Sequence, residues 1–418
     1  METSKITYYP LKVLLGFLVF TEILFFLGPI DFNIPNPFGL ITYLFILNSA
    51  LWCGYRFGVR TFCPSNYEMR TEIINIIIIA GVVLEFLSLV SMWSQSGISI
   101  SIDSLLESIT NPGAAYYSDS NEEAETSIMG ILLSPISFAA IPLAIATWRD
   151  RPRLIKMLIV LLVFITIAKW LGVGKRKGLL DIIAIVAFCE FACHPKLIEN
   201  KVLHKKMVYV LIGFLVVFIA YFISSNLSRH GKDNLADAII SSSFYDCKDV
   251  YLEFLPPVFT LILMNVSDYL CQGYRALSLG LFYGILPLAP LGSSWFTIAI
   301  AKKIGYDPLP DTYMMLLEKD YDIGMTLNWH TAYLWFANDF TFIGVPFIVY
   351  FIGYFWAQSW CDSINGRNIV AFPVMCLFTI MVLYFFANNQ VFSFSFFPFI
   401  VLFGFYMLTR IKSKIESE

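Results

Sequence analysis

Charged residues are scarce in this chain: they make up 14% of its 418 residues, whereas 58% are apolar and 17% are aromatic. Apolar runs of about 20 residues, enough to cross a bilayer, recur along the sequence, and no stretch has the composition of a separate soluble domain. The composition therefore excludes a soluble protein, and we expect no nucleic acid as a partner. It predicts an all-α polytopic integral membrane protein with a single membrane domain, residues 1–418.

Residues that hold metals or form disulfides are few and scattered. None of the four histidines has a second ligand at helical spacing, which a zinc site on a helix needs. Of the eight cysteines, only Cys247 and Cys271 lie in a segment expected on the outer side, so at most one disulfide is possible. We therefore expect no metal, no cofactor and no disulfide framework.

Ten segments have the length and composition of transmembrane helices. They are residues 11–29, 39–58, 73–92, 128–148, 156–173, 178–193, 207–223, 342–359, 369–386 and 392–409. The first of these lacks a small-residue cleavage site, so we expect it to be retained as a signal-anchor.

Lys and Arg collect in alternate connections between these segments. They are frequent in residues 56–70, 149–156 and 196–206 and at both ends of the chain, whereas residues 94–127 contain six acidic residues and no Lys or Arg. Cytoplasmic loops are enriched in Lys and Arg. The pattern therefore predicts that both termini are cytoplasmic.

The segment 224–341 is neither plainly soluble nor plainly membrane-spanning. Residues 254–266 are apolar but short, and residues 276–301 are interrupted by glycines and prolines. Both pieces could cross the membrane, which gives 12 spans, or both could lie as interfacial or re-entrant pieces, which gives 10. We favour 10 spans and a partly embedded periplasmic segment, because irregular backbone at membrane depth is tolerated only where protein or a wet cavity surrounds it.

Three adjacent cations, Lys175, Arg176 and Lys177, occupy a turn that the alternation places outside, against the usual charge distribution. The turn precedes a helix whose N-terminal amides can add to an anion site. We expect it to bind the pyrophosphate of a lipid, the alternative being unspecific contact with lipid phosphates. Arg229 and Arg275 are further outer cations, and Arg275 lies in a mostly apolar stretch, where a charge without a partner is costly.

A second polar cluster precedes the span at residue 342. His330 is a candidate catalytic residue because its ordinary pKa is near neutral, and Asp339 is a candidate base or an orienting partner. The alternatives are an interfacial hydrogen-bonding histidine and a helix N-cap at Asp339. Tyr274, Trp329 and Asn338 are candidate glycan-binding residues.

Three stretches carry a resemblance to a known family: Gly174-Lys-Arg-Lys-Gly-Leu-Leu-Asp181, Tyr269-Leu-Cys-Gln-Gly-Tyr-Arg-Ala-Leu-Ser278, and Asn328-Trp-His-Thr followed by Ala337-Asn-Asp339. With them, the chain resembles the bacterial O-antigen polymerase family, the Wzy-type oligosaccharide repeat-unit polymerases. The likeness extends to the expected plan of 10 to 12 spans with one large outer segment. Such enzymes resemble GT-C-like glycosyltransferases that use lipid-linked donors.

The resemblance implies a membrane glycosyltransferase of the bacterial inner membrane that serves lipopolysaccharide biosynthesis. It would transfer the growing glycan from undecaprenyl pyrophosphate to a new lipid-linked repeat unit at the periplasmic face, with Arg229 among its catalytic residues. Its partners would be undecaprenyl-pyrophosphate-linked oligosaccharides, membrane lipids and a chain-length-regulating co-polymerase. Two alternatives stay open: a flippase of lipid-linked oligosaccharide and an O-antigen ligase. The repeat-unit sugars, the linkage and the stereochemistry do not follow from the sequence.

Overall fold

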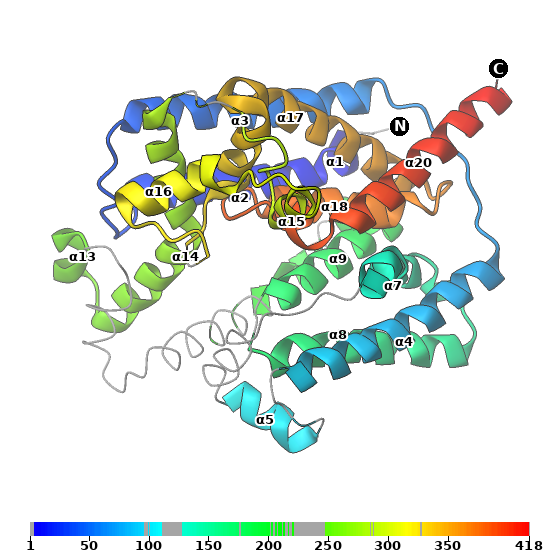
Figure 1. Ribbon diagram of the computed structural model, residues 1–418. Helices are drawn as coiled ribbons and strands as arrows, with labels where there is room; N and C mark the ends of the chain where they lie inside the picture. Colours follow the sequence, from blue (N-terminus) through cyan, green and yellow to red (C-terminus); the bar gives the residue numbers. More distant parts are fainter. Residues whose placement is uncertain are drawn as a thin grey trace.

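The chain folds as a bundle of helices. The computed structural model describes residues 4–95, 99, 101–110, 128–174, 177–200, 247–284, 286, 288–326 and 328–417, with scattered positions from 202 to 220. These ranges contain no strand beyond two isolated bridges. Figure 1 shows both termini at one end of the bundle, which we call the inner end. We call the opposite end, where α13 (Asp249–Phe254) and α16 (Tyr313–Tyr321) lie, the outer end.

Nine of the ten segments expected to cross the membrane are helical. They correspond to α2 (Tyr9–Leu27), α3 (Pro37–Arg60), α4 (Thr71–Gln95), α7 (Ile128–Ala146), α8 (Arg153–Gly172), α9 (Lys177–Cys193), α17 (Thr331–Asn365), α18 (Ala371–Leu383) and α20 (Phe396–Ser417). Within the described ranges, six of these are long and apolar enough to cross a membrane: α2, α3, α4, α7, α8 and α17. The tenth segment, 207–223, lies largely outside the described residues.

Shorter helices connect or cover these. They are α1 (Ser4–Thr7), α5 (Ile102–Thr110), η1 (Trp148–Asp150), α10 (Lys196–Glu199), α15 (Trp295–Lys303), η2 (Leu309–Asp311) and α19 (Gln390–Phe394).

The outer segment contains one continuous helix where we expected two separate apolar pieces. α14 (Pro257–Tyr283) begins at a proline, which the first helical turn tolerates because its N–H would be unpaired there anyway. It ends at Gly284, whose φ of 77° a glycine adopts readily. No proline lies between, so the helix continues, and the expected division into residues 254–266 and 276–301 is wrong. Figure 1 shows α14 crossing the outer end from α13 toward α3, roughly at right angles to the long helices.

The longest helix, α17, changes direction at the outer end. Thr341 has φ 57° and ψ 166° within it, so residues 331–340 and 342–365 form two helical pieces. The second piece packs closely along α3: a Cβ on Gly54 would lie 1.9 Å from the carbonyl O of Tyr350. Small residues let helix backbones approach closely in membranes, and α3 and α17 form such a pair.

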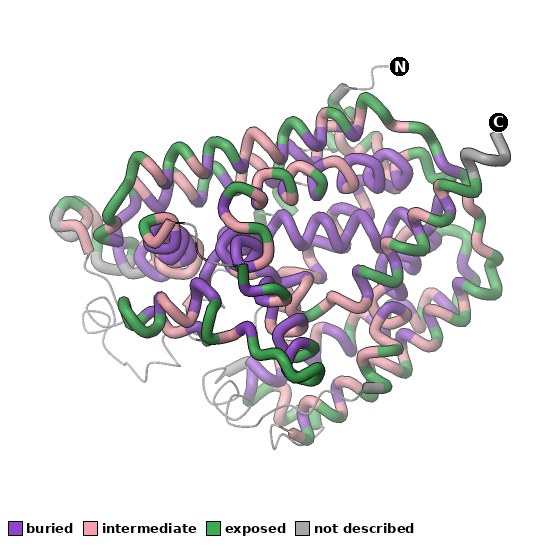
Figure 2. Tube along the Cα trace, turned by 45° about the horizontal axis from the view of Figure 1, so that its top comes forward, coloured by how far each residue is buried: buried purple, intermediate pink, exposed green. Residues whose placement is uncertain are grey.

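The core is centred on α18. All 13 of its residues are buried, although its length falls short of a full membrane span. Figure 2 shows buried residues concentrated on the central helices, and exposed residues along the outermost ones. Since exposed apolar side chains such as Phe45, Phe164 and Phe347 point outward from these helices, the surface matches a lipid environment.

A charge pair connects α4, α7 and α8 within the bundle. Lys169 Nζ lies 2.5 Å from Glu85 Oε2, and the hydroxyl of Ser137 donates to Glu85 Oε1 at 2.5 Å. Both charged side chains are about nine-tenths buried, with 9% and 12% of their surface exposed. A charge in a membrane span is costly unless it is paired, so this pair fixes how the three helices fit together.

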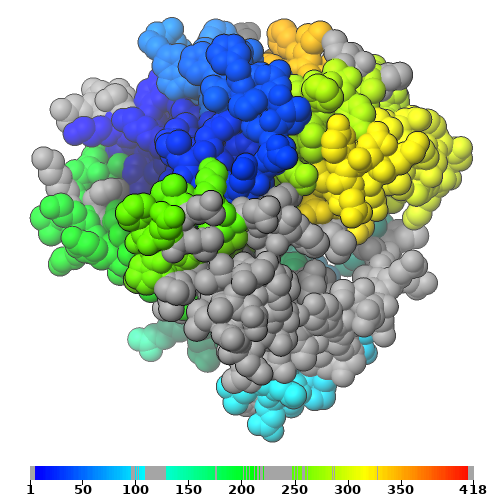
Figure 3. All heavy atoms as spheres, turned by 90° about the vertical axis from the view of Figure 1, so that its left-hand side faces the viewer, coloured from blue at the N-terminus to red at the C-terminus, as the bar shows by residue number. Residues whose placement is uncertain are grey.

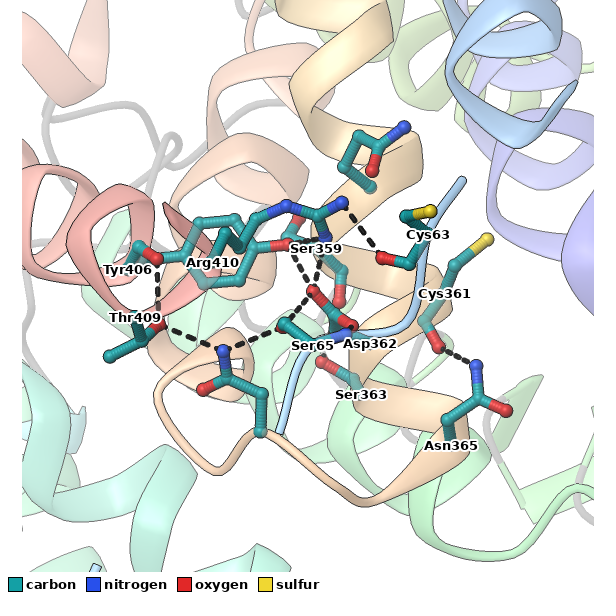
Figure 4. Close-up of polar contacts among 12 residues, drawn as sticks. Cys63, Ser65, Ser359, Cys361, Asp362, Ser363, Asn365, Tyr406, Thr409 and Arg410 are labelled. Carbon is teal, nitrogen blue, oxygen red and sulfur yellow. Dashed lines mark hydrogen bonds and ion pairs between the residues drawn. The ribbon is translucent and has the colours of Figure 1, made fainter. Parts of the chain in front are cut away.

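At the inner end, a buried carboxylate ties α20 to the rest of the bundle. Asp362 accepts hydrogen bonds from Ser65 N at 3.0 Å, from Ser65 Oγ at 2.7 Å and from the Tyr406 hydroxyl at 2.7 Å. Arg410 forms an ion pair with the same carboxylate and donates to the carbonyl O of Cys63 at 2.9 Å. Figure 4 shows these groups converging on Asp362. Because protein donors surround this carboxylate, we assign it a structural role.

Candidate functional site

The three stretches that carry the family resemblance lie together at the outer end, although they are far apart in the sequence. Gly174 follows α8 and residues 177–181 begin α9, residues 269–278 lie on α14, and residues 328–339 lead into α17 and form its first turns. All three approach the connection that follows α18, at residues 384–389. Figure 3 looks onto this end of the molecule: α16, in yellow, lies beside the blue N-terminal helices, and the acidic helix α5, in cyan, lies at the far edge.

The basic turn contacts this connection through Lys177. The Tyr384 hydroxyl donates to the carbonyl O of Lys177 at 3.3 Å. The ammonium group lies 2.6 Å from Asp181 Oδ2 and about 5 Å from two aromatic ring centres, those of Tyr384 (5.5 Å) and Phe394 (5.1 Å). Lys177 is thus held in place, with its charge partly balanced by Asp181, at the N-terminus of a 17-residue helix. Such a position favours an anion.

Local geometry explains why the turn has this form. Gly174 has φ 64°, a value that most other residues avoid, and it lies in the turn just after α8. Gly178 faces the indole of Trp170 so closely that a Cβ there would lie 2.1 Å from the ring. Three predicted cationic site residues lie outside the described residues: Lys175, Arg176 and Arg229.

The residues of α14 divide between two faces. Tyr274 is completely buried, and its hydroxyl lies 2.7 Å from Thr21 Oγ1 on α2. The structure therefore does not place Tyr274 where a sugar can reach it, and we assign it to packing. Gln272 and Arg275 are half-buried on another side of the helix.

Gly273 brings α14 against the connection. A Cβ on this residue would lie 2.3 Å from the carbonyl O of Phe386 and 3.0 Å from Thr331 N. Only a residue without a side chain allows this approach. The glycine between Gln272 and Tyr274 therefore determines how near α14 comes to the start of α17.

Gln272 links α14 to the segment before α17. Its Oε1 accepts hydrogen bonds from Asn328 Nδ2 at 3.1 Å and from Trp329 N at 3.3 Å. The indole of Trp329 also meets the ring of Tyr269 edge to face, with centroids 5.5 Å apart. Tyr269 in turn interacts electrostatically with Tyr384. Trp329 is half-buried, so this aromatic pair forms part of an accessible wall.

His330 lies inside the protein. Its side chain is fully buried, with Nδ1 2.9 Å from the carbonyl O of Asn328, and its backbone N donates to Asn388 Oδ1 at 2.9 Å. Burial lowers the pKa of His330 to about 4, although the hydrogen bond to the carbonyl of Asn328 acts in the opposite direction. A buried, neutral imidazole is poorly suited to take a proton from a substrate, so we assign His330 to positioning.

Asn338 and Asp339 hold the turn that precedes α15. Asn338 is buried, with Oδ1 accepting from Tyr313 N and Nδ2 donating to the carbonyl O of Gly292, both at 3.0 Å. The amide is thus used within the protein and is not free for a glycan. Asp339 is half-buried, and its Oδ1 accepts from Gly292 N at 3.0 Å. The Asp339 carboxylate therefore stabilises the neighbouring turn at Gly292, whereas the alternative role expected from the sequence was an N-cap of its own helix.

Asn388 and Asn389 are polar residues of the site that the sequence analysis missed. Asn388 Oδ1 accepts from the indole N–H of Trp335 at 2.9 Å as well as from His330 N, and Asn389 Nδ2 donates to the carbonyl O of Ser293 at 2.9 Å. The sequence carries a signal for them: two asparagines follow closely on the apolar segment 369–386, where unpaired amides would be costly.

The chemistry available at the outer end is that of cations, amides and aromatic rings. In the ranges that the structure describes, no three His, Cys, Asp or Glu side chains come close enough to hold a metal ion. No family model, curated protein or solved structure matches this chain.

Proposed function

We propose that this protein is a membrane glycan polymerase that transfers the growing glycan from undecaprenyl pyrophosphate to a new lipid-linked repeat unit. One observation carries the proposal: the described parts of residues 174–181, 269–278 and 328–339, the stretches on which the family resemblance depends, meet at one end of the bundle. This end is opposite both termini. With cytoplasmic termini, it faces the periplasm of a bacterial inner membrane, where lipid-linked oligosaccharides are polymerised.

The arrangement suits departure of a pyrophosphate. Negative charge develops on the leaving oxygen in the transition state, and fixed cations and helix amides stabilise it. Lys177 at the start of α9 is held in place by Asp181 and Tyr384, and Lys175, Arg176, Arg229 and Arg275 would add positive charge. Arg presents a planar fork that suits phosphate oxygens.

The aromatic wall and α14 suit the remaining parts of the substrate. The edge-to-face pair of Tyr269 and Trp329 offers apolar ring faces for sugars. α14 crosses the outer end beside α2 and α3, at the depth where a polyprenyl chain passes from the bilayer to its head group. An O-antigen ligase, one of the two alternatives, would use the same undecaprenyl-pyrophosphate-linked donor, with lipid A-core as its acceptor.

A flippase is less well supported by the distribution of charge. The one buried Lys among the described residues, Lys169, is paired with Glu85, whereas a transporter needs polar groups along its path. The polar groups of the site instead lie together at the outer end.

The proposal is tested with the purified full-length chain in proteoliposomes that contain undecaprenyl-pyrophosphate-linked repeat units from the producing strain. We expect glycans of two or more units without nucleotide sugar or added metal. Lipid-linked units that move across the bilayer at constant length would instead support a flippase. Growth only after addition of lipid A-core would support a ligase.

A further inference from the structure

Asp268 lies on α14 directly before the aromatic wall. It precedes Tyr269, whose ring contacts Trp329, and it lies one helical turn before Gln272, which holds the 328–329 segment. Asp268 as a whole is half-buried. It makes no hydrogen bond or ion pair with any residue in the described part of the chain.

This sets Asp268 apart from the other acids near the site. The carboxylate of Asp181 is paired with Lys177, and that of Asp339 receives the N–H of Gly292. A carboxylate that is partly removed from water without a partner carries a desolvation cost. Such groups cluster at functional sites, because the same burial makes them better proton acceptors.

The spacing on α14 places Asp268 on one face with Gln272 and Arg275. Residues four and seven positions apart lie on the same side of a helix, and seven residues rise about 10 Å at 1.5 Å each. An in-line displacement needs a base near the attacking hydroxyl and a cation near the leaving oxygen, each at about 3 Å. This rise between the two backbone positions leaves room for an anomeric carbon between the side chains of Asp268 and Arg275.

We propose that Asp268 is the general base that removes the proton from the acceptor hydroxyl, an assignment that rests on the proposed polymerase function. The hydroxyl O–H bond breaks, and the proton passes to a carboxylate oxygen of Asp268. The hydroxyl oxygen forms a bond to the anomeric carbon of the growing glycan. The bond from this carbon to the pyrophosphate breaks, and the electron pair leaves with the pyrophosphate near Arg275 and Lys177. The assignment replaces His330, which is buried, and Asp339, which holds the Gly292 turn.

The electrostatic setting agrees with this role. Burial raises the pKa of the Asp268 carboxyl to about 7. A base is most effective when its pKa is near the working pH. The buried thiol of Cys271, on the same helix, interacts electrostatically with Asp268.

The test uses full-length protein in proteoliposomes with lipid-linked repeat units from the producing strain. Asp268→Asn keeps the size of the side chain and removes the base, so turnover should fall by about 10²–10⁴-fold. Binding of undecaprenyl pyrophosphate, the probe for the donor site, should stay within about threefold of wild type. The matched control is Asp311→Asn, an exposed acid on η2 at the same end, which should keep full turnover.

A second variant covers the case in which Asp268→Asn is inactive for structural reasons. Asp268→Ala leaves space for a small carboxylate, and formate should restore at least tenfold of its turnover, whereas formate should not change the wild type. Turnover of Asp268→Asn above one-third of wild type would overturn the proposal, as would loss of undecaprenyl pyrophosphate binding in both variants. If wild-type protein itself does not elongate the glycan, the proposed polymerase function is wrong. That outcome is distinct from a failure of the Asp268 assignment alone.

Discussion

Replacing Gly273 by alanine tests the contact that brings the three stretches together. The added Cβ would lie 2.3 Å from the carbonyl O of Phe386 and 3.0 Å from Thr331 N. Both neighbours are backbone atoms, so no side chain can rotate away. Since ordinary contact begins at 3.4 Å, α14 has to move away from the connection by about 1 Å.

The cost follows from two opposing effects. Overpacking of this kind costs about 1–3 kcal/mol, whereas alanine is better than glycine in a helix by about 1 kcal/mol. The matched control is Gly16→Ala on α2, where no atom lies within 4 Å of the added Cβ. Because both changes gain the same helix preference, the difference between them isolates the steric cost of about 1–3 kcal/mol. A displacement of 1 Å can also lower a rate about 100-fold.

The assay measures thermal unfolding of the two variants in the same detergent, and glycan elongation in proteoliposomes. We expect Gly273→Ala to unfold at a lower temperature than Gly16→Ala and to elongate about 100-fold more slowly than wild type, although it removes no polar group. If Gly273→Ala is as stable as the control and elongates normally, α14 does not pack against Phe386 as described.

Four other substitutions test the remaining parts of the structure. Asp362→Ala leaves the half-buried cation Arg410 and three hydrogen-bond donors without their buried acceptor, and it should destabilise the protein by about 3–5 kcal/mol in thermal unfolding. A loss under 1 kcal/mol would contradict the inner-end network. Glu85→Gln and Lys169→Met should each lower the yield of folded protein. The double variant should be more stable than the less stable of the two single variants, because no charge is then left alone. If the effects of the two substitutions on stability simply add, the pairing is contradicted. Gln272→Ala removes the acceptor of two hydrogen bonds and should slow elongation without changing affinity for undecaprenyl pyrophosphate; unchanged turnover would show that it does not position Trp329.

The spans could be predicted from the sequence because one physical signal determines them. An apolar run long enough to cross a bilayer forms a helix, since every backbone group must be paired internally there. Nine of the ten predicted segments are helical for this reason. The outer segment carries no such signal. The continuity of α14 through residues 257–283 and the turn of α17 at Thr341 depend on what packs against them.

The site was predictable in its position along the chain but less so in its details. The residue types identified Lys177 and Trp329, which lie at the outer end. They did not show that Tyr274 faces α2 or that Asn338 is enclosed. Which face of a helix meets its neighbours is determined by tertiary packing, which the residue types of α14 do not show by themselves. Asp268 differs from the other acids near the site only in the folded structure, where Asp181 and Asp339 have partners and Asp268 has none among the described residues.

The most direct test of the polymerase function is complementation of a strain that lacks this gene, with the surface glycan ladder separated on a gel. We predict that the deletion leaves a single repeat unit on lipid A-core, that the wild-type gene restores the ladder, and that Arg176→Ala and Arg229→Ala do not. A deletion strain that keeps its full ladder would contradict the proposed function. So would one that loses all surface glycan while lipid-linked single units accumulate inside the cell, because that is the result expected of a flippase.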